Sequence, residues 1–359
     1  MEQIAFLLPG SGQPVFWREI IRCAGILTAV LTLLAIRLWR KKPAVGVFLL
    51  SVCAAAASVY AARIVHWYCC FEDYGSFSAA VTDLANGGYS LIGAFVGVVL
   101  VFSLGRLLCI VRDLPDVFDD IALSAGLGIG VGRMGEFFSA ADRGKLVIEN
   151  AALHYIPLSA PVVDTVTGQT EWRFATFAFQ SLVGFYLFTL LIARIIWFRS
   201  GPDERRGRMR GGNGALLFLG AYCLSQILLD STRYDALFLR SNAFVSLEQI
   251  LCLTTSVFLM ALYCVRAVKE KGRSLLTCLP LWLLFLGGFG LAGYMEYYVQ
   301  RHGDLFFYSY GLMILGLSAV FLSMQGMNAL RARREKPVPP SGVGGPAQAD
   351  LPEEAKAGV

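Results

Sequence analysis

The stretch from residue 128 to residue 137 places charged side chains in an apolar, glycine-rich segment. It reads Gly-Ile-Gly-Val-Gly-Arg-Met-Gly-Glu-Phe, with Arg133 three residues before Glu136. A charge at the centre of a membrane helix costs at least ~2.5–3.5 kcal/mol, so Arg133 should face protein, water or a ligand head group. Arg133 is therefore a candidate for binding a lipid phosphate. The alternatives are an arginine that extends to the membrane interface or an internal ion pair with Glu136.

A second polar group closes a later apolar segment. Gln226, Asp230 and Arg233 are spaced four and three residues apart, so on a helix they share one face. Exposure to lipid does not explain three polar groups that converge at a membrane boundary. The group is either a structural hydrogen-bonded cluster or a head-group site, and the spacing leaves both open.

Basic side chains beside a glycine follow the first stretch. Arg143, Gly144 and Lys145 are consecutive, and basic side chains beside glycine backbone could hold an anion by charge and by N–H groups. An ordinary solvated loop is an equal alternative. Gly93 and Gly97 lie at helical spacing, which is typical of close helix packing.

Metal and nucleophile motifs are not evident. The three histidines, among them His66, are far apart in the sequence, and the nine cysteines are scattered. The adjacent Cys69 and Cys70 make neither a disulfide framework nor a metal-ligand spacing. We therefore predict no metal and no organic cofactor.

The composition is that of a membrane protein. Of the 359 residues, 56% are hydrophobic and 16% are charged, against about 25% charged in soluble domains. Apolar runs near the ~20 residues that cross a bilayer predict an all-α polytopic bundle of about nine transmembrane helices. They fall at about 18–37, 44–65, 87–108, 119–137, 175–198, 213–230, 245–265, 276–298 and 306–328.

The distribution of basic residues predicts the orientation of the chain. Lysine and arginine gather after the first, third, fifth, seventh and ninth predicted spans, as in the run from Arg37 to Lys42. Cytoplasmic loops hold the excess of these residues, so we expect the N-terminus outside and the C-terminus in the cytoplasm. The net charge of +5 is thus a topology signal, and nothing indicates nucleic-acid binding.

We expect three parts along the chain. Residues 1–268 form a membrane core with an outer loop at 138–174, and residues 269–334 form two additional transmembrane helices. Residues 335–359 have the composition of a disordered cytoplasmic tail. Within the outer loop, alternation around 160–165 and 169–172 predicts a small hairpin hinged at Thr167-Gly168.

Together these segments resemble the prolipoprotein diacylglyceryl transferase family. The best match runs from Gly132 to Phe138 and on to Gly144, and it resembles the family signature G-R-x-G-N-F-x-N followed by glycine. Residues 87–93 are similar to G-G-x-S-x-H-G, and Gln249 resembles a family glutamine. Residues 222–235 are similar to Y-G-x-x-R-x-x-x-E-x-x-R-x-x-D. The likeness covers about residues 15–265.

The resemblance implies a transferase of the bacterial cytoplasmic (inner) membrane. Such enzymes move diacylglyceryl from phosphatidylglycerol to a cysteine thiol of a lipoprotein precursor peptide. The implied partners are therefore the membrane, that peptide, and phosphatidylglycerol or a similar anionic phospholipid. The family's arginines are thought to bind the head group, so the resemblance implies this role for Arg133 and Arg233. Gly144 would then shape the mouth of the lipid site. The expected substrate-binding set also includes Arg143, Gln226 and Ser90.

The chain departs from the family where the chemistry needs a base. Ile92 replaces the histidine assigned to proton removal from the thiol. A thiol of pKa ~8.5 is only a few per cent thiolate at neutral pH, so attack requires a base or a strongly positive site. We expect Glu136 or Asp230 to be catalytic, with His66 as a further candidate. The other departures are Glu136 and Ser139 for asparagines, Gln226 for arginine, Asp230 for glutamate and Ala24 for tyrosine.

Two other functions compete with the transferase. The first is an impaired homologue that binds phospholipid or lipoprotein without transfer, which the departures favour. The second is a transporter, which would need a polar path from face to face. The polar residues cluster at the outer boundary, so the transporter ranks third.

Overall fold

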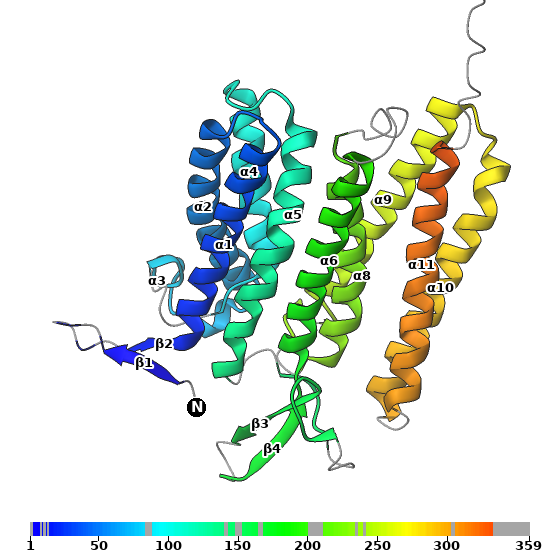
Figure 1. Cartoon of the computed structure of the whole chain (residues 1–359). Coiled ribbons are helices and arrows are strands. Elements are labelled where there is room, and N and C mark those ends of the chain that lie inside the picture. Colours follow the sequence, from blue (N-terminus) through cyan, green and yellow to red (C-terminus); the bar gives the residue numbers. More distant parts are fainter. Residues whose placement is uncertain are drawn as a thin grey trace, which may run out of the picture.

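The computed structural model describes residues 3–7, 9, 12, 14–82, 88–139, 143–147, 153–163, 168–199, 211–233, 236–239, 242–302 and 306–332. Within these ranges the chain is a bundle of long helices that run side by side, with short strands at one end (Figure 1). The predicted all-α polytopic membrane fold is confirmed. The expected tail at 335–359 lies outside the described residues.

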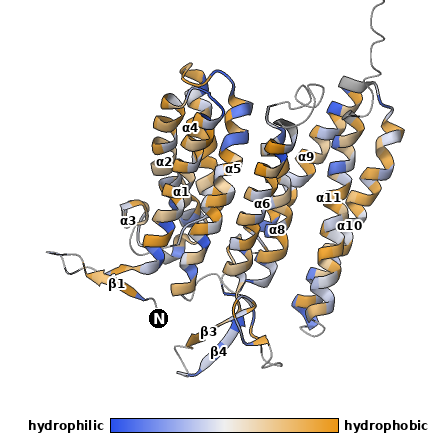
Figure 2. Ribbon diagram, in the orientation of Figure 1, coloured by the Kyte–Doolittle hydropathy of each residue, from blue (hydrophilic) through white to orange (hydrophobic). Residues whose placement is uncertain are grey.

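A helix lies at each of the nine predicted spans. Seven of these nine helices are long and apolar enough to cross a membrane, whereas α4 and α5 do not meet both conditions. Figure 2 shows hydrophobic residues along the helices and hydrophilic ones gathered near their ends. The helices are α1 (Trp17–Trp39), α2 (Val45–Cys69), α4 (Leu91–Leu107), α5 (Leu114–Arg133), α6 (Thr176–Arg199), α8 (Asn213–Thr232), α9 (Leu247–Lys271), α10 (Leu275–His302) and α11 (Phe306–Ala332).

Helix α5 begins and ends earlier than the predicted 119–137. Asp113 caps its first turn by accepting a hydrogen bond from the backbone N–H of Asp116, and Pro115 lies in that turn. Both are signals for a helix start. After Arg133 the chain tightens into the 3₁₀ helix η2 (Met134–Phe138). Arg133 and Glu136 therefore do not share one continuous α-helix.

The glycines of α5 allow two neighbouring helices to approach closely. Gly132 lies against Gly25 of α1, and Gly130 lies against Gly184 of α6. A Cβ atom on Gly184 would be 2.6 Å from the backbone nitrogen of Gly130. On α4, a Cβ atom on Gly93 would be 2.4 Å from the carbonyl oxygen of Ala61 on α2. The glycine-rich stretch that ends in Arg133 is thus a packing surface.

Gly184→Ala is expected to destabilise the bundle, because the new methyl group meets backbone atoms that cannot rotate away. Overpacking of this kind costs about 1–3 kcal/mol. The matched control is Gly287→Ala in α10, where an added Cβ atom meets nothing within 4 Å. Thermal unfolding of the two purified variants measures the difference. Equal melting temperatures would contradict the packing role of Gly184.

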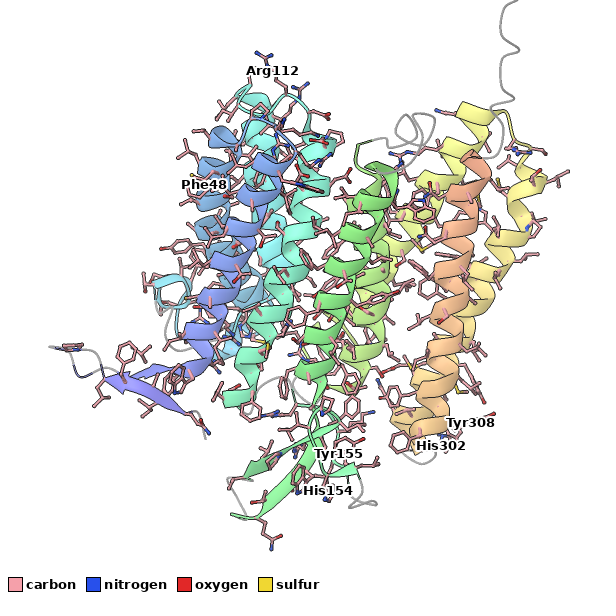
Figure 3. All side chains as sticks on the ribbon, viewed as in Figure 1. Phe48, Arg112, His154, Tyr155, His302 and Tyr308 are labelled. Carbon is pink, nitrogen blue, oxygen red and sulfur yellow. The ribbon has the colours of Figure 1, made fainter. Side chains whose placement is uncertain are left out.

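Short antiparallel strands gather at one end of the bundle, here called the hairpin end. The two strands of the predicted hairpin are confirmed as β3 (Ser159–Val163) and β4 (Thr170–Phe174), with Pro161 opposite Trp172, and Thr167 of the expected hinge lies outside the described residues. Figure 3 labels His154 and Tyr155 at this end and Arg112 at the opposite end, here called the Arg112 end. The sequence did not predict β1 (Ile4–Leu7), β2 (Pro14–Phe16), β5 (Phe238–Leu239), β6 (Asn242–Ser246), α3 (Phe77–Thr82) or the 3₁₀ helix η1 (Phe71–Asp73).

An ionic network joins α1 to α5 at the Arg112 end. Arg37 Nη1 lies 3.1 Å from Asp116 Oδ2 and 3.0 Å from Asp120 Oδ2. Arg40 contacts the same two carboxylates, and Lys42 contacts Asp116. Asp120 is fully buried. Several basic residues that predict the orientation therefore also fasten these two helices together.

Helices α10 and α11 pack on α8 and α9 through a shared apolar core. Buried side chains from all four helices form one continuous cluster, among them Leu224, Leu259, Phe285 and Val320. At the hairpin end, Tyr310 of α11 donates a hydrogen bond to the carbonyl oxygen of Ser231 at 3.1 Å. The two additional helices thus reach the end of α8 where the predicted polar group lies.

Candidate functional site

A polar cavity of about 130 Å³ lies at the hairpin end, where α8 ends and α9 begins. Arg233 immediately follows α8, and Asp230 lies in its last turn. Lys145 comes from the loop after η2. The cavity is therefore lined by charges of both signs. Its polar lining residues are Lys145, Asp230, Ser231, Arg233, Ser246, Gln249, Glu296 and Gln300.

Arg233 is held between two carboxylates. Its Nη1 atom lies 3.4 Å from Asp230 Oδ1 and 3.8 Å from Glu248 Oε2. Asp230 is buried and also accepts a hydrogen bond from the Ser246 hydroxyl. The predicted proximity of Asp230 and Arg233 is confirmed. These ion pairs fix the guanidinium at the cavity wall.

Backbone contacts bring Gly144, in the loop after η2, to Arg233 at the end of α8. A site built from these two segments requires this proximity. The two residues form an antiparallel β-bridge. The N–H of Gly144 donates to the Phe174 carbonyl at 2.7 Å, and the N–H of Lys145 donates to the Thr232 carbonyl at 2.9 Å. A Cβ atom on Gly144 would be 2.9 Å from the Thr232 oxygen. A residue larger than glycine would therefore displace the loop segment that carries Lys145.

Lys145 adds a second cation to the cavity. Burial lowers the pKa of its ammonium group, and the negative charge of Glu296 opposes that shift. Glu296 belongs to α10, so α10 acts electrostatically on the loop after η2.

Glu136 lies apart from this cavity, in a second cluster. Its buried carboxylate accepts hydrogen bonds from Arg22 Nε at 2.8 Å and from the Ser139 hydroxyl at 2.9 Å. Glu136 thus forms an ion pair with Arg22 of α1, and the α-helix that carries Arg133 ends before Glu136. Arg143 is also buried, and its Nη2 donates to the Ser139 carbonyl at 2.9 Å. Its guanidinium lies 4.5 Å from the centre of the Phe177 ring.

Arg133 and Gln226 both lie outside the cavity. Arg133 is half-buried, and its charge acts on the Tyr222 hydroxyl of α8. Gln226 is fully buried and accepts a hydrogen bond from Gln180 of α6 at 3.2 Å. Neither side chain lines the cavity. Gln226 thus shares α8 with Asp230 but belongs to a different set of contacts.

Ser90 lies in a third group, where α4 begins beside α2. It is buried, and its N–H donates to the Ala62 carbonyl at 3.1 Å. Nearby, Arg63 donates to the Tyr74 hydroxyl at 2.9 Å, and that hydroxyl is 2.8 Å from His66 Nδ1. The charges of Arg63 and Arg22 both act on the adjacent Tyr89 hydroxyl. Ser90 is therefore next to a basic cluster and away from the cavity.

Sequence reasoning assigned no site role to several residues of these clusters, among them Arg22 and Glu296. For Arg22, a charge inside the first apolar span, three residues after Glu19, was a usable signal. For Glu296, nothing near it in the sequence points to the cavity.

A model of the prolipoprotein diacylglyceryl transferase family matches residues 4–265. The chain belongs to this family. The match ends in α9, close to the expected limit of the likeness at about residue 265. Helices α10 and α11 therefore lie beyond the family match.

Several proteins named phosphatidylglycerol–prolipoprotein diacylglyceryl transferase are similar to this chain. The one from Parasynechococcus marenigrum is 30% identical over 184 residues, which cover 50% of this chain and 62% of that protein. The one from Synechococcus elongatus is 29% identical over 265 residues, covering 71% and 87%. The one from Clostridium kluyveri is 25% identical over 244 residues, covering 66% and 87%. The chain thus spans about three fifths of the first relative and most of the other two.

Proposed function

We propose that this protein is a membrane transferase that moves diacylglyceryl from phosphatidylglycerol to the cysteine thiol of a lipoprotein precursor. The observation that carries the proposal is the family match over residues 4–265, which includes both segments that bring Gly144 to Arg233. In this reaction the sulfur attacks a glyceryl carbon. A C–S bond forms, the C–O bond to phosphate breaks, glycerol phosphate leaves, and the thiol proton passes to a base.

Arg233 and Lys145 are the proposed phosphate-binding cations at the cavity. Preorganised positive charge stabilises the negative charge that grows on a departing phosphate. Gly144 supports this site through its bridge to Arg233. Arg133 remains a candidate for a second head-group contact. Arg143, Gln226 and Ser90 remain proposed substrate-binding residues, and their burial favours roles in shaping the site.

Of the two predicted catalytic carboxylates, Asp230 is the better placed to take the thiol proton. It lines the same cavity as Arg233, and a general base must lie within hydrogen-bond reach of the proton that it removes. Glu136 is held by Arg22 and Ser139. We assign Glu136 a role in positioning Arg22, with proton transfer as its alternative role.

We infer that the cavity faces the outside of the cytoplasmic membrane. The basic residues Arg37, Arg40 and Lys42 lie at the Arg112 end, and basic residues mark the cytoplasmic side. The hairpin end would then be extracytoplasmic, with the N-terminus outside. Phosphatidylglycerol and the precursor peptide would both reach the cavity from that side.

Transfer of label tests the proposed function. Purified protein is reconstituted with phosphatidylglycerol labelled in its diacylglyceryl part and a peptide that carries the lipoprotein cysteine. We expect labelled peptide, and none from a peptide with serine in place of that cysteine. A family enzyme assayed in parallel validates the conditions. Transfer by that enzyme with none by this protein would contradict the proposal.

A further inference from the structure

Helix α10 lies outside the family match, yet it completes the cavity wall. Glu296 and Gln300 project from its last two turns and line the cavity together with Lys145 and Arg233. Residues beyond position 265 therefore contact the space in which the head group is proposed to bind. The additional helices do more than extend the apolar core.

Glu296 is a buried acceptor whose hydrogen-bonding capacity is only partly used. The residue is 7% exposed. Its Oε1 atom accepts from Gln300 Nε2 at 2.5 Å, whereas Oε2 has no hydrogen-bond partner in the described part of the chain. An ionised carboxylate is only an acceptor, and a buried acceptor left without a donor is costly. The cavity thus presents an acceptor that a ligand can satisfy.

The cavity lining offers both cations and an unsatisfied acceptor. Arg233 and Lys145 provide cations for a phosphate, and the carboxylate of Glu296 provides an acceptor for hydroxyl groups. A ligand that uses all three carries both an anion and hydrogen-bond donors. A phosphoglycerol head group has this arrangement, because its hydroxyl groups are separated from its phosphate by carbon atoms.

We propose that Glu296 of α10 binds the hydroxyl groups of a phosphoglycerol head group whose phosphate lies against Arg233 and Lys145. This inference rests on the proposed function and extends it to the choice of lipid. Glu296 is here a binding residue for the part of the lipid that leaves with the phosphate. Helix α11 keeps α10 in place, and the Tyr310 hydrogen bond to Ser231 anchors it at the cavity.

Glu296→Gln tests this role by direct binding of short-chain lipids to the full-length protein in detergent. Hydrogen bonds to a charged group are stronger than neutral ones by about 1–1.5 kcal/mol, which corresponds to about tenfold in affinity. We expect the variant to bind phosphatidylglycerol about tenfold more weakly, and to bind phosphatidic acid, which lacks the glycerol hydroxyls, at least as tightly as wild type does. Retained binding of phosphatidic acid also reports an intact fold.

Two control variants separate hydroxyl binding from other effects. Glu72→Gln removes an exposed carboxylate that does not line the cavity and should change neither affinity. Tyr310→Phe removes the hydrogen bond that anchors α11 at Ser231 but keeps the carboxylate of Glu296, so any loosening of the cavity should affect both lipids alike. This variant should keep the preference for phosphatidylglycerol over phosphatidic acid.

Three results would overturn the inference and leave the transferase proposal standing. The first is that Glu296→Gln binds phosphatidylglycerol as tightly as wild type does. The second is that the variant loses equal affinity for phosphatidylglycerol and phosphatidic acid. The third is that the wild-type protein binds phosphatidylethanolamine more tightly than phosphatidylglycerol, which would assign Glu296 to an ammonium group. Failure of wild-type protein both to bind phosphatidylglycerol and to transfer label would instead remove the proposed function itself.

Discussion

Arg233→Gln is expected to lower the rate of diacylglyceryl transfer about 10²–10³-fold, the usual cost of losing one preorganised charge-stabilising donor. The substitution also leaves Asp230 and Glu248 without the guanidinium that lies 3.4 and 3.8 Å from them. Both carboxylates would then repel the phosphate. The apparent kcat/KM for labelled phosphatidylglycerol in proteoliposomes measures the loss.

The matched control is Arg173→Gln, which removes an arginine from the hairpin. Arg173 Nη2 bonds to Glu171 at 2.9 Å, and its side chain does not line the cavity. Transfer by this variant should stay within a few-fold of wild type. If Arg233→Gln behaved like Arg173→Gln, the phosphate would bind elsewhere and the assigned site would be wrong.

Asp120→Ala is expected to lower the free energy of unfolding by about 3 kcal/mol, the lower end of the cost of breaking a buried ion pair, because Asp116 alone then faces Arg37, Arg40 and Lys42. Arg37 and Arg40 both contact Asp120, which is fully buried. Unfolding of the purified protein in detergent, followed by circular dichroism against denaturant, measures the change.

Glu72→Ala serves as the comparison, because Glu72 is an exposed carboxylate. Its loss should change stability by less than about 0.5 kcal/mol. Similar unfolding midpoints for the two variants would show that the α1–α5 network does not stabilise the bundle.

The helices and the hairpin could be predicted because local patterns specify them. Long apolar runs locate the nine helices, and alternation around Pro161 and Trp172 locates the hairpin. The predicted bounds of α5 were wrong because the acidic residues of its first turn have the composition of a loop. The capping signal at Asp113 and Pro115, which identifies the true start, lay before the apolar run that was followed.

The candidate site was only partly predictable, because its members come from distant parts of the chain. Asp230 and Arg233 could be paired, since they are three residues apart at the end of a predicted helix. Glu136 bonds to Arg22, which is 114 residues away, and no local spacing indicates that pair. Glu296 reaches the cavity only because α10 packs on the end of α8. Such contacts depend on how the helices are arranged, which a single sequence does not state.

The position of a bound lipid phosphate tests the account most directly. A structure of the full-length protein with phosphatidylglycerol should show the phosphorus atom within the cavity, with a phosphate oxygen in hydrogen-bond contact with the Arg233 guanidinium. Phosphate density beside Arg22 and Arg63, with none at Arg233, would contradict the account and move the site to the basic cluster near Ser90.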